Sequence, residues 1–175
     1  MTPDQLRAAQ APLKARYQED GASARHTLSA VGVIVPESVS CRIETGHGPT
    51  IHAGLHPAAG GDGSWACSAD MLLQALVGCA GVTLTAVATA LGVPFRGGRV
   101  IAEGDLDFRG TLGVKKDVPV GFEAVRLRFE LDADATPEQL AKLMQLTERY
   151  CVVAQSIKPA PTLSGTLNSS EAGLK

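Results

Sequence analysis

The sequence predicts an α+β fold in which antiparallel sheets pack around one long, buried central helix. Three observations support this prediction. Residues 71–95 contain no charged side chain, which is typical of a helix that other elements surround. Segments of alternating apolar and polar residues lie before and after this helix, as expected for strands with one buried face. Two further segments begin with a Thr-Pro pair, which favours the start of a helix.

The first half of the chain contains one helix and a group of short strands. A surface helix is predicted from residue 3 to about residue 19, with Thr2 as N-cap and Pro3 in the first turn. Three stretches follow, "RHTLSAVGVIV", "SVSCRIETG" and "TIHAGLH", and they predict two or three strands of a meander. The loop from His56 to Ser64 is rich in glycine and is expected at the surface.

The central helix has recognisable ends. Ser68 is a candidate N-cap, and Asp70 lies in the first turn, where the helix dipole favours a carboxylate. Gly92 and Pro94 mark its end. The helix is long enough to span a membrane, but it contains Gln74 and several threonines and lacks flanking basic clusters. We therefore predict a buried core helix and no membrane partner.

The second half of the chain predicts two longer strands and a helix. Residues 97–113 and 121–134 show period-2 alternation. A helix is expected from Thr136, because Gln139 three residues later completes a capping box. The side chains predicted to face inward from the strands are Val100, Ala102, Leu106, Phe108, Val125, Leu127, Phe129 and Leu131.

Composition and charge exclude several classes of function. The chain has 175 residues, enough for one domain, and its net charge is −2 with scattered basic residues. It therefore has no electrostatic footprint for nucleic acid. The N-terminal segment lacks the apolar core of a secretory signal. We predict a cytoplasmic protein, in which the four cysteines do not form a structural disulfide framework.

Two of the four cysteines have settings that suggest chemistry. Cys79 lies in the middle of the apolar helix beside small residues, and Cys151 directly follows the last helix. An inert reading is open for both, because free cysteine usually behaves as a small buried hydrophobe. That reading is stronger for Cys41, in a strand, and for Cys67, at the entrance of the central helix.

A reactive Cys79 requires a group that stabilises its thiolate, because burial alone raises the pKa of a thiol. The candidates are Arg42 in the second strand and His52 or His56 in or after the third. Asp70 lies nine residues before Cys79, which is about 13 Å along a helix. It is too far to contact the thiol, but it is placed to hold an arginine that does. Its other reading is a role at the helix dipole alone.

Two segments resemble the cysteine motifs of the OsmC/Ohr family of thiol peroxidases. "SADMLLQALVGCAGVTLTAVATALGV" is similar to the family's first-cysteine helix, and "ERYCVVAQSI" is similar to its second-cysteine segment. The resemblance covers roughly residues 27–163. It divides the chain into an N-terminal helical extension (1–26), an OsmC-like domain (27–163) and a flexible tail (164–175).

The resemblance implies an intertwined homodimer with active sites at the subunit interface. It implies that Cys79 attacks an organic hydroperoxide, that Cys151 then forms a disulfide with Cys79, and that an external dithiol reduces this disulfide. It implies no metal or organic cofactor. The chain departs from the family pattern at Asp70, where the family has Glu, and at Val152, where it has Pro.

The activating arginine of the family has no clear counterpart. Arg42 is nearest in setting, and His56 is the alternative. Other functions therefore stay open, namely an OsmC-like protein that binds an apolar ligand or senses redox state, and a purely structural dimer partner. A peroxidase requires Cys79 and Cys151 close enough to form a bond.

Overall fold

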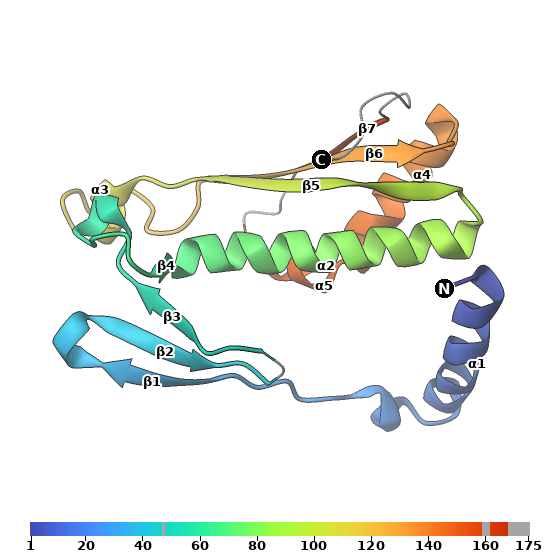
Figure 1. The fold of residues 1–175 in the computed structure, drawn as a ribbon, viewed down its shortest axis with the longest axis horizontal. Coiled ribbons are helices and arrows are strands. Elements are labelled where there is room, and N and C mark those ends of the chain that lie inside the picture. Colours follow the sequence, from blue (N-terminus) through green and yellow to red (C-terminus); the bar gives the residue numbers. More distant parts are fainter. Residues whose placement is uncertain (47, 159–161, 168–175) are drawn as a thin grey trace.

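The computed structural model describes residues 1–46, 48–158 and 162–167, and it has a mixed α+β fold with two sheets (Figure 1). The N-terminal sheet comes first along the chain, the long helix α2 follows, and the C-terminal sheet and the remaining helices complete the fold. In Figure 1, α2 runs across the middle of the molecule between the two sheets. The prediction of a long central helix that packs against a sheet is confirmed.

The C-terminal sheet holds the core. Its strands are β5 (Phe95–Asp105), β6 (Ala124–Ala133) and β7 (Thr162–Leu167), in that order. β5 and β6 are antiparallel, as predicted, but β7 is parallel to β6. Parallel pairing arises because the chain leaves β6 and returns through helices, which is a crossover connection. The four side chains of β6 that the alternation predicted to face inward are at most 2% exposed, and they are Val125, Leu127, Phe129 and Leu131.

α2 (Ser68–Leu91) packs on this sheet through one face. Its buried residues recur every fourth position, at Leu76, Ala80, Leu84 and Ala88. The N-cap is Cys67 rather than the predicted Ser68, and the helix ends at Gly92, which adopts the left-handed conformation with φ of 66°. By length and composition alone α2 could cross a membrane. Val82 on the other face is 74% exposed, so one chain covers only part of the helix.

α4 (Pro137–Tyr150) and the short helix α5 (Val152–Ser156) lie against α2. The predicted capping box of α4 is confirmed. The Gln139 backbone N–H donates to the Thr136 hydroxyl, and the Thr136 N–H donates back to the Gln139 side chain. Cys151 separates the two helices, and its extended backbone ends one and begins the other.

The N-terminal sheet has four strands, β1 (Val31–Val35), β2 (Ser40–Glu44), β3 (Ile51–Gly54) and β4 (Ala66–Cys67). β1, β2 and β3 form the predicted antiparallel meander, and the unpredicted β4 pairs parallel to β3. Neither hydrophobic core of the described residues includes a side chain from this sheet. Within one chain, the sheet therefore has no hydrophobic core of its own.

The N-terminal helix α1 (Pro3–Glu19) is confirmed as a surface helix. Thr2 and Gln5 form a capping box, and no residue of the helix is buried. α1 contacts α2, and a 3-10 turn, η1 (Gly21–Ala24), follows it. Two more 3-10 turns lie before β2 and after β3, namely η2 (Pro36–Ser38) and η3 (Pro57–Ala59).

Two predicted segments differ from the structure. The predicted strand over residues 97–113 ends at Asp105, and α3 (Phe108–Thr111) follows it. The Asp107 carboxylate accepts the Arg109 backbone N–H at 2.9 Å and so caps a helical turn. The tail predicted from residue 164 also begins too early, because β7 continues to Leu167 through its pairing with β6. Residues 168–175 lie outside the described part of the chain.

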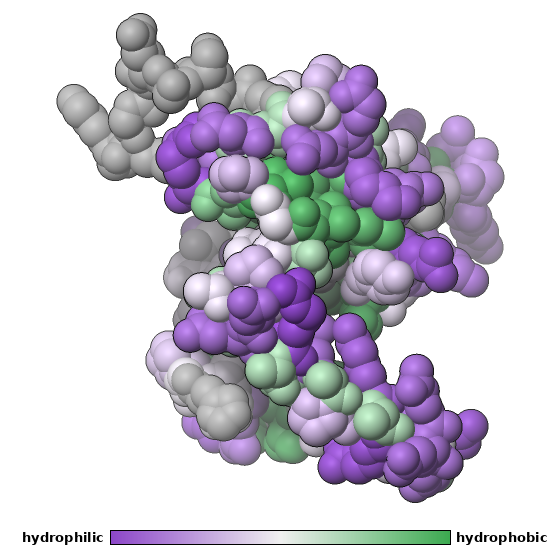
Figure 2. Space-filling view, turned by 90° about the vertical axis from the view of Figure 1, so that its right-hand side faces the viewer, coloured by the Kyte–Doolittle hydropathy of each residue, from purple (hydrophilic) through white to green (hydrophobic). Residues whose placement is uncertain are grey.

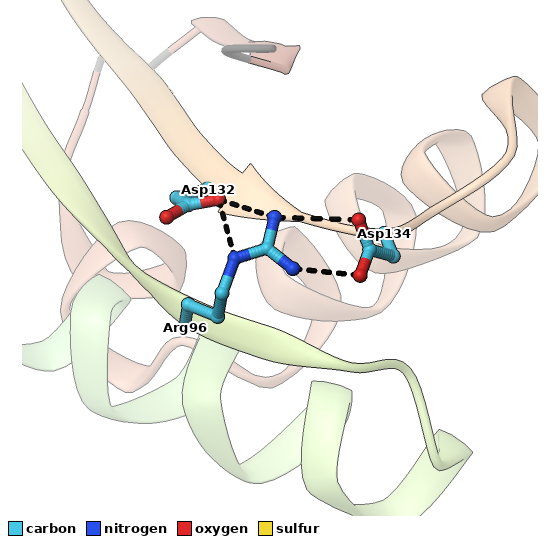
Figure 3. Close-up of polar contacts among 3 residues, drawn as sticks. All are labelled: Arg96, Asp132 and Asp134. Carbon is cyan, nitrogen blue, oxygen red and sulfur yellow. Dashed lines mark hydrogen bonds and ion pairs between the residues drawn. The ribbon is translucent and has the colours of Figure 1, made fainter. Parts of the chain in front are cut away.

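An arginine joins the start of β5 to the end of β6 (Figure 3). The Arg96 Nε atom donates to Asp132 at 2.8 Å, and the Nη1 atom donates to Asp134 at 2.6 Å. The register of the two strands shifts beside this arginine, between Phe95 and Gly97. The ion pairs therefore fasten the strand ends at an irregularity, directly before the N-cap of α4.

Candidate functional site

Cys79 lies in the middle of α2, at the edge of the face that packs on the core. Its side chain is half-buried, whereas the next residue, Ala80, is fully buried. Cys79 packs against the main hydrophobic core. The thiol therefore lies where the buried side of the helix meets its open side.

Cys151 lies at the junction of α4 and α5 and is fully buried within the same core. Its backbone N–H donates to the Thr147 carbonyl at 2.9 Å, which closes the last turn of α4. The sequence placed this cysteine directly after a helix, and the structure confirms that position. α4 and α5 both contact α2, and this packing brings Cys151 to Cys79.

The two thiols lie in the same core and act on each other's ionisation, so their pKa values are displaced in opposite directions. Burial alone would raise the pKa of Cys79. Hydrogen bonds from the Val153 N–H, Cys151, Thr83 and the Val152 N–H outweigh burial, and they lower this pKa below its ordinary value. Burial raises the pKa of Cys151, and the neighbouring Cys79 raises it further. Cys79 is therefore the thiol that ionises first.

Three groups that lower the pKa of Cys79 were missed from the sequence. The N–H groups of Val152 and Val153 belong to the first turn of α5, where helix N–H groups lack backbone partners. No side-chain type encodes such backbone donors, so they are visible only once the fold is known. Thr83 had a detectable signal, because residues four apart in a helix lie on the same face.

Arg42 does not lie among the groups that act on Cys79. Its side chain is exposed on β2, opposite Val33 of β1 and His52 of β3. It shares this face of the sheet with charged residues because β-strand side chains alternate. Within one chain, the structure therefore does not bring Arg42 to the thiol pair.

His56 and Asp70 also take positions away from Cys79. The Nδ1 atom of His56 accepts the Ala58 N–H at 3.0 Å, which caps η3, and its ring stacks on Phe108 with a centroid distance of 4.8 Å. Asp70 is exposed in the first turn of α2, and among the described residues it forms no ion pair or hydrogen bond. The position of Asp70 therefore matches the helix-dipole role that the sequence left open, and His56 is engaged in a local cap.

The remaining cysteines lie outside the thiol pair. Cys41 and Cys67 are free and half-buried, on β2 and at the end of β4. Among the residues that the structure describes, no cluster of three or more His, Cys, Asp or Glu side chains is arranged to hold a metal ion.

A separate cavity of about 340 Å³ lies between α1 and α2. Figure 2 shows the molecule from the end where α1 meets the C-terminal half of α2, and hydrophobic side chains gather at the surface there. Cys79 is not among the residues that line this cavity, which are Met1, Leu6, Gly81, Val82, Thr85, Ala86 and Thr89.

Comparison with known families and structures identifies the fold. Residues 61–164, more than half of the chain, match the family described as OsmC-like protein. A comparison with curated proteins gives no match. Among solved structures, an OsmC-like protein from Mycoplasma pneumoniae is similar with a TM-score of 0.68 and 13% identity, over 81% of this chain and 97% of that one.

Two other similar structures are named for hydroperoxide resistance. One is an organic hydroperoxide resistance protein OsmC from Legionella pneumophila, with a TM-score of 0.58 and 12% identity, over 83% of this chain and 100% of that one. The other is an organic hydroperoxide resistance protein from Elizabethkingia anophelis, with a TM-score of 0.63 and 14% identity, over 83% and 98%. At such identities the likeness concerns the fold.

Proposed function

The chain belongs to the OsmC-like protein family, and on this premise we propose that it is a two-cysteine thiol peroxidase that reduces organic hydroperoxides. One observation carries the proposal. Cys79 of α2 and Cys151 at the junction of α4 and α5 pack in the same hydrophobic core, and each displaces the pKa of the other, downward for Cys79 and upward for Cys151. A low-pKa thiol beside a second, protonated thiol is the arrangement that peroxide reduction by a thiol pair requires.

In the proposed first step, the Cys79 thiolate attacks the terminal oxygen of the hydroperoxide. A sulfur–oxygen bond forms, the O–O bond breaks, and the organic fragment leaves as an alcohol after it takes up a proton. Cys79 becomes a sulfenic acid. The Cys151 sulfur then attacks Cys79, water leaves, and a disulfide forms. The apolar surroundings of Cys79 favour an alkyl or lipid hydroperoxide as the substrate.

An external dithiol completes the proposed cycle by supplying two electrons. Its thiolate attacks the disulfide, and its second thiol then closes its own disulfide and releases both cysteines. Cys79 is half-buried whereas Cys151 is fully buried. The half-exposed Cys79 sulfur is therefore the accessible point of attack.

Backbone groups take the part that the sequence assigned to a cation. The N–H groups of Val152 and Val153 lower the pKa of Cys79, and backbone N–H groups carry their proton at every pH. Hydrogen bonds to the charged form lower a pKa without a counter-charge. Arg42 and His56 are not needed for this proposal within one chain.

The proposed assembly is a homodimer. The N-terminal sheet presents an apolar face made of Ile34, Cys41, Ile43, Ile51 and Ala53. Ile34 on this face is 77% exposed, and Val82 on the open side of α2 is 74% exposed. A second copy of the chain that covers both surfaces would bury apolar area that one chain leaves in water.

The first test is to mix the reduced protein with one equivalent of cumene hydroperoxide and to map the disulfides by mass spectrometry. The proposal expects a Cys79–Cys151 bond within seconds. The double variant Cys41→Ser/Cys67→Ser is the control, and it should form the same bond. Cys79→Ser should consume no peroxide, whereas Cys151→Ser should complete one turnover and then overoxidise at Cys79.

A second candidate function is binding of an apolar ligand or redox sensing without turnover. It is favoured by the cavity between α1 and α2 and by the absence of a described cation among the groups that act on Cys79. Thiols that stay reduced over minutes with cumene hydroperoxide would favour this candidate. A Cys79–Cys151 disulfide that forms but is never reduced by a dithiol would favour a sensor.

A further inference from the structure

A buried threonine in α4 carries a hydroxyl without a partner. The Thr147 side chain is fully buried, and its Oγ1 atom forms no hydrogen bond to any residue that the structure describes. A helical threonine usually donates to the carbonyl four residues earlier, as the Thr85 hydroxyl does to the Gly81 carbonyl at 2.9 Å. Thr147 does not make this bond to the Leu143 carbonyl, so its hydroxyl proton is free for another acceptor.

Thr147 lies one helical turn before Cys151, the buried cysteine of the thiol pair. The Cys151 backbone N–H donates to the Thr147 carbonyl at 2.9 Å, so the helical geometry of α4 continues as far as this cysteine. Both side chains are fully buried. Residues four apart in a helix have Cβ atoms about 5–6 Å apart on the same face. Rotation of these two short side chains can therefore bring the hydroxyl to the Cys151 sulfur.

The free hydroxyl destabilises the fold at this position. Thr147 belongs to the buried face of α4 together with Leu143, and a buried polar group without a partner has a cost that valine, of the same shape, does not have. Such groups are rare, and a redox or catalytic role is one of their accepted explanations. The protonated Cys151 thiol is a weak acceptor, whereas a thiolate is a strong one. The hydroxyl thus has a partner when Cys151 is ionised.

An ionised Cys151 arises in the reductive half of the proposed cycle. The thiolate of an external dithiol attacks the half-exposed Cys79 sulfur of the disulfide. A bond forms between these two sulfur atoms, the Cys79–Cys151 bond breaks, and its electron pair stays on Cys151. This thiolate is formed inside the core, where burial raises the pKa of Cys151. A thiolate of high pKa leaves slowly, so a hydrogen-bond donor at this sulfur would accelerate the step.

We propose that the Thr147 hydroxyl donates to the Cys151 thiolate as it leaves the disulfide and so speeds the reduction of the protein. The second thiol of the dithiol then transfers its proton to Cys151, closes the dithiol's own disulfide and releases Cys79 as a thiolate. The inference rests on the proposed function for the place of this step in a catalytic cycle. The step itself requires only a Cys79–Cys151 disulfide, whichever oxidant has formed it.

The test measures the reduction of a disulfide that is formed beforehand. The parent protein, Thr147→Val and Thr147→Ser are made in the Cys41→Ser/Cys67→Ser background, and diamide oxidises the thiol pair without any hydroperoxide. Dithiothreitol then reduces the disulfide, and samples stopped with acid are analysed by mass spectrometry. Thr85→Val is the matched control, because it removes a hydroxyl that is bonded only to the backbone.

Thr147→Val should slow the reduction by dithiothreitol roughly three- to tenfold, as expected for the loss of one hydrogen bond to a developing charge. Thr147→Ser, which keeps a hydroxyl, and Thr85→Val should be reduced at the parent rate. Iodoacetamide should alkylate the reduced Cys79 equally fast in every variant, because the hydroxyl acts only on the leaving Cys151. If Thr147→Val fails to fold, Thr147→Ala is measured in its place, because it also lacks the hydroxyl.

Three results would overturn the proposal. One is an unchanged reduction rate in Thr147→Val. Another is equal slowing in Thr147→Ser, which would assign the effect to packing rather than to the hydroxyl. The third is a matching loss of Cys79 alkylation in Thr147→Val, which would assign the effect to access to the attacked sulfur.

Peroxide consumption separates this inference from the proposed function. A wild-type protein that consumes no cumene hydroperoxide, together with slower reduction in Thr147→Val, contradicts the peroxidase and retains the role of Thr147. A wild-type protein that consumes it, with equal reduction rates in the parent and Thr147→Val, contradicts the role of Thr147 alone. A parent protein in which diamide forms no Cys79–Cys151 disulfide contradicts both.

Discussion

Strands β6 and β1 have similar apolar residues but opposite environments. The inward side chains of β6 are at most 8% exposed, whereas Val31 and Ile34 of β1 are 58% and 77% exposed. The C-terminal sheet is covered by α2, and the N-terminal sheet contributes nothing to the cores of the described residues (Figure 1). An apolar strand thus indicates that a surface becomes buried, but it does not identify the element that buries it.

The largest expected effect is in the packed half of the molecule, which consists of the C-terminal sheet and the helices that pack on it. Phe129→Ala removes a fully buried ring from β6 and should lower the free energy of unfolding by about 3–5 kcal/mol. Ile34→Ala in β1 should lower it by less than about 1 kcal/mol when measured at dilution, because the side chain is largely exposed. Urea unfolding measures both. Equal losses for the two variants would remove the contrast between the sheets.

The next effect concerns assembly. Ile34→Glu places a charge on the apolar face of the N-terminal sheet, so it should weaken the proposed dimer roughly tenfold or more. Val31→Glu is the control, because Val31 pairs with Glu44 on the opposite, partly charged face. Sedimentation velocity over a range of concentrations measures the dissociation constant. A wild-type protein that stays monomeric at all concentrations would contradict the proposed homodimer.

The packed half also contains a buried hydroxyl without a hydrogen-bond partner, and its removal should increase the stability of the fold. The Thr147 side chain is fully buried, and its hydroxyl has no hydrogen-bond partner among the described residues. Thr147→Val keeps the shape and removes the unpaired hydroxyl, so it should raise the free energy of unfolding by about 1 kcal/mol. Thr136→Ala is the contrasting variant, and loss of this N-cap should lower it by about 1 kcal/mol. A loss in Thr147→Val would mean that the hydroxyl has a partner, such as water.

The sequence predicts best those elements whose signals are local in the chain. The alternation in β6, the N-cap at Thr2 and the capping box at Thr136 are complete within a few residues, and the structure confirms them. The strands β4 and β7 were missed because each depends on a parallel partner that is distant in the chain.

The predictions for the candidate site also differ in how much they depend on the fold. The closeness of Cys79 to Cys151 followed from a family resemblance, and the structure brings the two thiols together. Arg42 and His56 were inferred from residue type alone, and the structure gives both local positions. The backbone donors at Val152 and Val153 exist only because the chain turns at Cys151, which no residue pattern describes.

The smallest expected effect is at the edge of the packed half, where Arg96 joins β5 to Asp132 and Asp134 (Figure 3). The hydrogen bond and charge of Arg96 lower the pKa of Asp134. This carboxylate therefore stabilises the fold above its unfolded pKa of about 3.9, and the contribution is lost as the pH falls through the lower folded value. Asp134→Asn should melt slightly below the wild type at about pH 6, and the difference should shrink at about pH 3 and in high salt. Both side chains are exposed, so the change should be small beside that of Phe129→Ala. A difference in melting temperature that persists unchanged in acid would mean that the ionised carboxylate does not stabilise this edge of the sheet. The difference in stability between the C-terminal sheet and β1 would then depend on apolar packing alone.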